Sequence, residues 1–154
     1  MATYSKWTKA QGNVTAGVWS LYVKINFAED QMAANDIFQL AKLKNGWIIL
    51  SSWYRMPGTA STSTATMDIG TTKDGTGQEI AAGLDLDSIG NDDWNVGVIT
   101  PDHADGSKYQ VRTSDTYLTC EALGSTVTDG VLEINLQILS SLGDSEPVDM
   151  NIDD

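Results

Sequence analysis

Alternating apolar and polar residues mark both ends of the central part of this chain. Between residues 20 and 28 every second side chain is apolar: Leu21, Val23, Ile25 and Phe27. Residues 131–139 repeat the pattern with Leu132, Ile134, Leu136 and Ile138. A strand with one face on a core and the other toward water requires this period of two. Both segments are therefore predicted to be half-buried strands.

Three consecutive strands are predicted between these two ends. Residues 36–43 and 47–56 are apolar runs separated by Asn45 and Gly46, the dipeptide most typical of a tight hairpin turn. The second run begins apolar on both faces and ends polar and aromatic, so we expect a central strand whose later part lies near an edge or a contact surface. After a proline-glycine break, residues 65–70 alternate cleanly and complete the set.

Weaker patterns follow in the second half of the chain. Short strands are expected at residues 94–100, 109–112 and 117–123. Residues 79–89 fit no period well, and we favour a short strand and a loop there because Gly83 lowers the helix propensity.

These segments add up to eight or nine short strands, with frequent turns and no long helix. The pattern is typical of an all-β, antiparallel two-sheet sandwich, and the strand count favours a jelly roll. The predicted core consists of Leu21, Val23, Ile25, Phe27, Ile69, Leu118, Cys120, Leu132, Ile134, Leu136 and Ile138.

The length of 154 residues predicts one domain with a core large enough to need no disulfide or metal. We divide the chain into an N-terminal arm (residues 1–19), a β-sandwich domain (residues 20–142) and an acidic C-terminal tail (residues 143–154). The tail holds five acidic residues and one proline, so we expect it to be extended.

The arm combines glycines with two cations and two indole rings: Lys6, Trp7, Lys9 and Trp19. In one interpretation the tryptophans are anchors on the surface of a neighbouring chain, with the lysines against carboxylates, because aromatic side chains dominate interface energetics. In the other, both rings cap the core of their own domain. The sequence leaves both interpretations open.

Charge excludes two classes of partner. The chain has 21 acidic and nine basic residues and a formal net charge of -12, so phosphate repulsion opposes binding to nucleic acid and to anionic membranes. The first residues contain no apolar secretory segment, and no run is long enough to span a bilayer. We expect a soluble protein.

No set of residues predicts an enzyme. Asp102, His103 and Asp105 share one loop, but no nucleophile motif or metal-binding motif accompanies them, so surface turn chemistry is the favoured interpretation. Cys120 is the only cysteine and lies on an apolar strand face, which indicates a small buried hydrophobe rather than a nucleophile. We expect no catalytic residue and no cofactor.

The acidic loop at residues 85–93 begins as a calcium-binding EF-hand loop does, with acidic residues at alternate positions and a glycine at the sixth. Its fifth position is Ile89 and its twelfth is Val96, where that loop needs oxygen ligands. A solvated acidic loop without a metal is therefore favoured.

Trp53, Tyr54 and Arg55 end the predicted central strand and form a second candidate contact surface. Exposed rings on a sandwich face can stack on sugars, and they serve protein interfaces equally well. A carbohydrate-binding function and a protein-binding function therefore both remain candidates.

Three stretches resemble one known family: the hairpin DIFQLAKLKNGWIIL, the strand ATMDIGTTKDG after a small-residue crossover, and the closing hairpin DTYLTCEALGSTVTDGVLEINLQIL. Their order over residues 20–140 is similar to that of the jelly-roll decoration, or cement, proteins of tailed-bacteriophage heads. The arm and the acidic tail have no counterpart in this resemblance.

The resemblance implies a structural virion protein on the outer surface of the capsid. Such a protein binds the major capsid protein across capsomer boundaries, usually as a dimer or trimer, and has no catalytic residues. The alternative is a carbohydrate-binding β-sandwich module or a phage adhesin, which the aromatic residues of the central strand also suit.

Overall fold

The structure is a computed structural model that describes residues 3–5, 10–11, 17–58, 61–71, 80–89, 93–97, 110–111 and 116–140. These residues form eleven strands and no helix. In chain order the strands are β1 (Thr3–Ser5), β2 (Ala10–Gln11), β3 (Gly17–Asn26), β4 (Ile37–Leu43), β5 (Ile48–Arg55), β6 (Thr66–Gly70), β7 (Ala81–Asp85), β8 (Asn95–Val96), β9 (Gln110–Val111), β10 (Thr116–Leu123) and β11 (Val131–Ser140).

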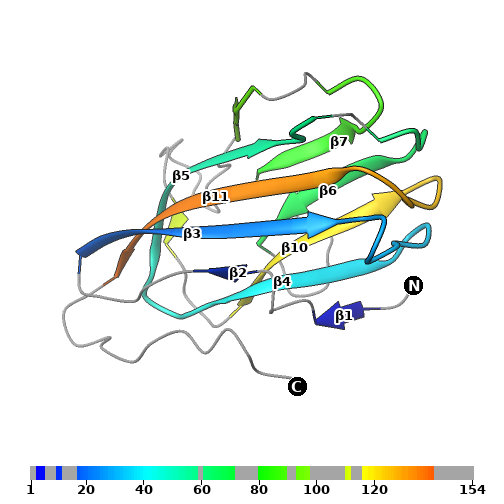
Figure 1. The fold of residues 1–154 in the computed structure, drawn as a ribbon. Coiled ribbons are helices and arrows are strands. Elements are labelled where there is room, and N and C mark those ends of the chain that lie inside the picture. Colours follow the sequence, from blue (N-terminus) through cyan, green and yellow to red (C-terminus); the bar gives the residue numbers. More distant parts are fainter. Residues whose placement is uncertain are drawn as a thin grey trace.

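Eight of these strands form two stacked four-stranded sheets, β3-β11-β5-β8 and β4-β10-β6-β7, as Figure 1 shows. The pairings are nested: β6 pairs with β7, β5 with β8, β4 with β10 and β3 with β11. This is the path of a long hairpin rolled into a jelly roll. The predicted antiparallel two-sheet sandwich is therefore confirmed.

Three short strands extend the sheets. β2 pairs with β3 and β9 pairs with β5, both antiparallel, while β1 pairs with β4 in parallel. The predicted strands at residues 94–100 and 109–112 correspond to β8 and β9, and the rest of both segments lies outside the described residues apart from Trp94 and Gly97.

The two terminal strands of the sandwich, β3 and β11, pair over ten residues, from Gly17 opposite Ser140 to Asn26 opposite Val131. Both strands alternate, so this register places the apolar side chains of both strands on one face. β3 begins three residues earlier than the strand predicted from residue 20, because the pairing continues through Val18 and Trp19.

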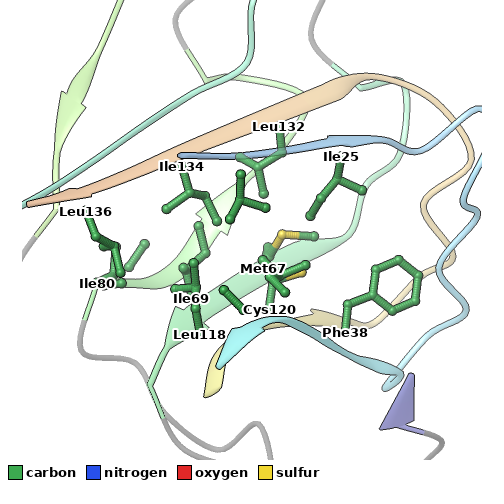
Figure 2. Packing of buried hydrophobic residues seen from close by; sticks show 14 of the residues in the cluster. Ile25, Phe38, Met67, Ile69, Ile80, Leu118, Cys120, Leu132, Ile134 and Leu136 are labelled. Atoms are coloured by element: carbon green, nitrogen blue, oxygen red, sulfur yellow. The ribbon is translucent and has the colours of Figure 1, made fainter. Parts of the chain in front are cut away.

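The core lies between the two sheets. All eleven residues predicted for it are at most 1% exposed. Figure 2 shows Leu132, Ile134 and Leu136 of one sheet facing Ile69 and Leu118 of the other. Burying each such side chain contributes about 1.5–3 kcal/mol relative to exposure, so this layer is the main source of stability.

Cys120 belongs to the same layer and is fully buried. Burial strongly raises the pKa of its thiol, because the charged thiolate is poorly solvated there. The prediction of a small buried hydrophobe is confirmed.

The β10–β11 turn holds the crossover that leads into β6. Asp129 accepts hydrogen bonds from the Ser61 hydroxyl (2.8 Å) and the Thr62 amide (2.9 Å). The Ser63 hydroxyl donates to the Thr126 carbonyl oxygen at 2.8 Å. The bonds from Ser61 and Thr62 lower the pKa of Asp129, because they favour the charged carboxylate.

Candidate binding face

Three of the seven residues proposed as contacts lie on β5. Trp53 and Arg55 are half-buried and point outward from the sheet, whereas Tyr54 is partly buried and packs against the core. Lys6, Trp7 and Lys9 lie outside the described residues.

Trp19 lies in the core. It is 8% exposed, and its ring meets the buried Trp47 edge to face, with centroids 5.0 Å apart and planes at 86°. Such aromatic pairs stabilise by about 0.5–1.5 kcal/mol beyond the area that they bury. Trp19 therefore caps the core of its own domain and is not an exposed anchor for a neighbouring chain.

Strand order brings the outward side chains of four strands together. β5 lies between β11 and β8, so Trp53 is opposite Asn135 on one side and Val96 on the other. On the far side of β11, Tyr22 of β3 is opposite Asn135. The result is an outer face rich in aromatic, amide and hydroxyl groups.

A depression of about 400 Å³ lies on this outer face and is lined by Ser20, Trp53, Trp94, Asn135 and Gln137. Its volume falls within the range of about 300–1,000 Å³ that is usual for small-molecule sites. Three strands and the residue before β8 supply this lining, so the site exists only when the sheet is assembled.

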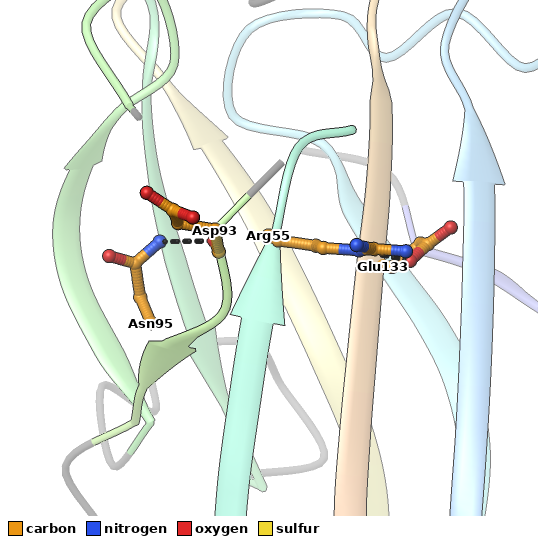
Figure 3. A network of polar contacts seen from close by, with 4 residues as sticks. All are labelled: Arg55, Asp93, Asn95 and Glu133. Carbon is orange, nitrogen blue, oxygen red and sulfur yellow. Dashed lines mark hydrogen bonds and ion pairs between the residues drawn. The ribbon is translucent and has the colours of Figure 1, made fainter. Parts of the chain in front are cut away.

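A polar network borders the depression. Arg55 Nε donates to Glu133 Oε2 at 2.7 Å, as Figure 3 shows, and Glu133 also accepts a hydrogen bond from Tyr22. The guanidinium of Arg55 lies over the ring of Trp94, 4.6 Å from its centroid. Tyr22, Glu133, Arg55 and Trp94 thus form a continuous chain of contacts across β3, β11, β5 and the entrance to β8.

This network raises the pKa of Tyr22 to about 12. Burial contributes most, and the hydrogen bond and negative charge of Glu133 add to it. At neutral pH the phenol is therefore protonated and donates to Glu133.

Close approach of the chain at Gly97 holds β8 against β5. The Gly97 amide donates to the Ser52 carbonyl oxygen at 2.8 Å. A Cβ atom at Gly97 would stand 2.1 Å from Ser52 Oγ and 2.9 Å from Ile80 Cγ2. Only glycine fits here without displacement, and this fit places Trp94 and Val96 beside β5.

Metal-binding groups do not gather in the described part of the chain. No three His, Cys, Asp or Glu side chains among these residues could hold a metal ion. Asp102, His103 and Asp105 lie outside the described residues. Among the described residues, no helix has the length and apolar character needed to cross a membrane.

In the acidic loop, Asp85 and Asp87 share a hydrogen bond. Hydrogen bonds from Ser88 and Asp87 lower the pKa of Asp85, and the bond and negative charge of Asp85 raise the pKa of Asp87. Asp85 and Asp87 are both exposed.

The sequence pattern predicts only part of the outer face of the β3-β11-β5-β8 sheet. Alternation predicts that Asn135 and Gln137 point away from the core. It does not predict the direction of Trp53, because the pairing of β5 with β11 shifts register between Gln137 and Ile138. What the pattern lacks is the strand order that puts Ser20 and Trp94 beside them. Among the described residues that line the depression, Trp53 alone belongs to the predicted contact residues.

Comparison with solved structures finds similar chains in three phage capsids. A chain in the capsid of Ralstonia phage GP4 is 14% identical, with a TM-score of 0.64, over 93% of this chain and 100% of that one. A chain in the acidic stable capsid of Helicobacter pylori bacteriophage KHP30 is 16% identical (TM-score 0.55, 84% and 91% covered). A chain in the capsid asymmetric unit of cyanophage Pam1 is 14% identical (TM-score 0.55, 85% and 91% covered).

At these identities the similarity is one of fold. It covers nearly the whole of each matched chain, so a sandwich of about this size accounts for each of them. No protein-family model matches the chain, and comparison with curated proteins gives no significant match.

Proposed function

We propose that this chain is a structural protein of a phage virion that decorates the outside of the head and stabilises contacts between capsomers of the major capsid protein. The observation that carries the proposal is the jelly-roll fold shared, nearly end to end, with chains from three phage capsids. The order of sequence segments that resembles decoration proteins supports it independently.

The charge of the chain supports binding to protein rather than to packaged nucleic acid. A net charge of -12 repels a phosphate backbone and suits a partner surface that presents basic groups. The proposed partners are the major capsid protein and further copies of this chain, as a dimer or trimer.

Attachment is tested by mixing the purified chain with heads assembled without it and sedimenting the heads. We expect saturable co-sedimentation and a higher temperature of head rupture once the chain is bound. Binding that does not saturate, or heads that rupture at an unchanged temperature, would contradict the stabilising role. The mass of the free chain in solution gives its oligomeric state.

The N-terminal arm is the proposed attachment segment, with Lys6, Trp7 and Lys9 as its contacts. Replacing all three by alanine tests this without removing Trp19, which the core needs. Lost co-sedimentation with an unchanged unfolding temperature supports an anchoring arm. Unchanged attachment would instead place the contact on the sheet, around Trp53, Tyr54 and Arg55, and Trp53→Ala is the variant that tests this.

A further inference from the structure

We propose that the depression on the outer face of the β3-β11-β5-β8 sheet binds a neutral saccharide. Its lining is Ser20, Trp53, Trp94, Asn135 and Gln137. This binding activity is separate from attachment to a capsid and does not depend on it.

Two indole rings supply the apolar part of the site. Trp94 is 40% exposed and Trp53 is half-buried, and both line the same depression. Large aromatic side chains are normally covered in a folded domain, so two of them left open at one depression mark a contact surface. A flat ring presents the apolar surface that the C–H face of a pyranose requires.

Side chains with paired donors and acceptors supply the polar part. The carboxamides of Asn135 and Gln137 each offer an oxygen acceptor and an N–H donor, and the Ser20 hydroxyl can do both. Sugar hydroxyls also donate and accept, so each can pair with such groups. The Gln137 carboxamide already accepts from the Ser51 hydroxyl at 3.2 Å, which orients it and leaves its N–H groups for a ligand.

The surrounding charges favour a neutral ligand. The lining residues that the structure describes are all uncharged, and the acid of the network, Glu133, is paired with Arg55. The net charge of -12 disfavours anions such as sialylated or phosphorylated sugars. The guanidinium of Arg55 over Trp94 disfavours a cation at that ring.

The site is also held in shape before any ligand binds. Arg55 holds the Trp94 ring, and Glu133 in turn holds Arg55. The backbone contact between Gly97 and Ser52 positions the strand that follows Trp94. Side chains fixed in advance lose less entropy on binding, which favours recognition of a small rigid ring.

The test is a titration of the isolated full-length chain with neutral sugars, followed by tryptophan fluorescence and by NMR. The probes are glucose, galactose, N-acetylglucosamine and their disaccharides, with glucuronic acid as the charged comparison. We expect saturable binding of at least one neutral sugar, with Kd of about 1 mM or below for a disaccharide. Glucuronic acid should bind more weakly.

Two variants remove one ring each. Trp53→Ala and Trp94→Ala should each weaken binding about tenfold or more. Val18→Ala changes an exposed residue of β3 that does not line the depression, so it should bind as the unchanged chain does. If a tryptophan variant is unfolded by circular dichroism, Asn135→Ala and Gln137→Ala provide the same readout with both rings in place.

Two outcomes would overturn the proposal. One is that none of these neutral sugars binds, and the other is that they bind equally well to all pocket variants. If sugars do not bind and Trp53→Ala loses attachment to heads, the depression is a protein contact. If the arm variant no longer attaches to heads but still binds sugar, the saccharide site is supported and is separate from the capsid contact.

Discussion

The two faces of the β3-β11-β5-β8 sheet are built from the same strands, but the inner face packs in the core and the outer face carries polar and aromatic side chains. From Leu132 to Ile138 along β11 the inward side chains are aliphatic and fully buried, whereas the outward ones between them are Glu133, Asn135 and Gln137. Any apolar side chain of suitable volume can fill an inward position, but the outward positions form specific hydrogen bonds and ring contacts. Residue pattern therefore determines the inner face, and residue identity determines the outer face.

Burial does not distinguish the two faces completely. Glu133 is an outward residue, yet it is 6% exposed because it is bonded to Arg55 and Tyr22. A buried charge without partners would cost several kcal/mol, so this carboxylate depends on both neighbours. Part of the outer face is thus a second, polar layer of packing.

The largest expected effect is on the inner face. Ile134→Ala leaves a cavity at a fully buried position of β11 and should lower the free energy of unfolding by about 2–5 kcal/mol, measured by urea denaturation. Gln137→Ala on the same strand should change it by about 1 kcal/mol or less, since it loses only a hydrogen bond with Ser51. Similar losses in both variants would contradict the division between the faces.

The next largest effect is expected when the ion pair between Arg55 and Glu133 is removed. Glu133→Gln keeps the shape but removes the charge that pairs with Arg55, and it should cost about 1–3 kcal/mol in the free energy of unfolding. The double variant with Arg55→Gln should cost less than the sum of the two single variants, because the second change loses a partner that is already gone. Additive costs would mean that the pair does not act as a unit.

The inner face is also the part that the sequence predicts well. Alternation in β3 and the next residue, in β6, in β10 and in β11 identifies all eleven predicted core residues, because one buried face imposes a period of two. The sequence pattern does not predict contacts between residues that are far apart in the chain. Trp19 belongs to a segment with little pattern, and its partner Trp47 is 28 positions away, so only the assembled sheet decides between arm and core.

A smaller effect concerns pH and Tyr22. The phenol pKa is raised from 10 to about 12 in the folded chain, so the folded state keeps its proton where the unfolded state loses it. This contribution to stability is complete below pH 10 and is lost as the pH rises from 10 to about 12. Urea midpoints across that range should therefore fall more steeply for the unchanged chain than for Tyr22→Phe. Equal slopes would show that Tyr22 is no more protonated in the folded state than in the unfolded one.

The smallest expected effect tests the outer face where it has no network. Val18 lies on β3 opposite Leu139 and is 58% exposed, so its apolar side chain gains little from folding. Val18→Ser should change the free energy of unfolding by about 0.5 kcal/mol or less, measured by urea denaturation beside Ile134→Ala. A loss near that of Ile134→Ala would mean that another segment or another copy of the chain covers this end of the sheet. The outer face would then be covered at Val18, and the part around Trp53 and Trp94 would remain accessible to a ligand.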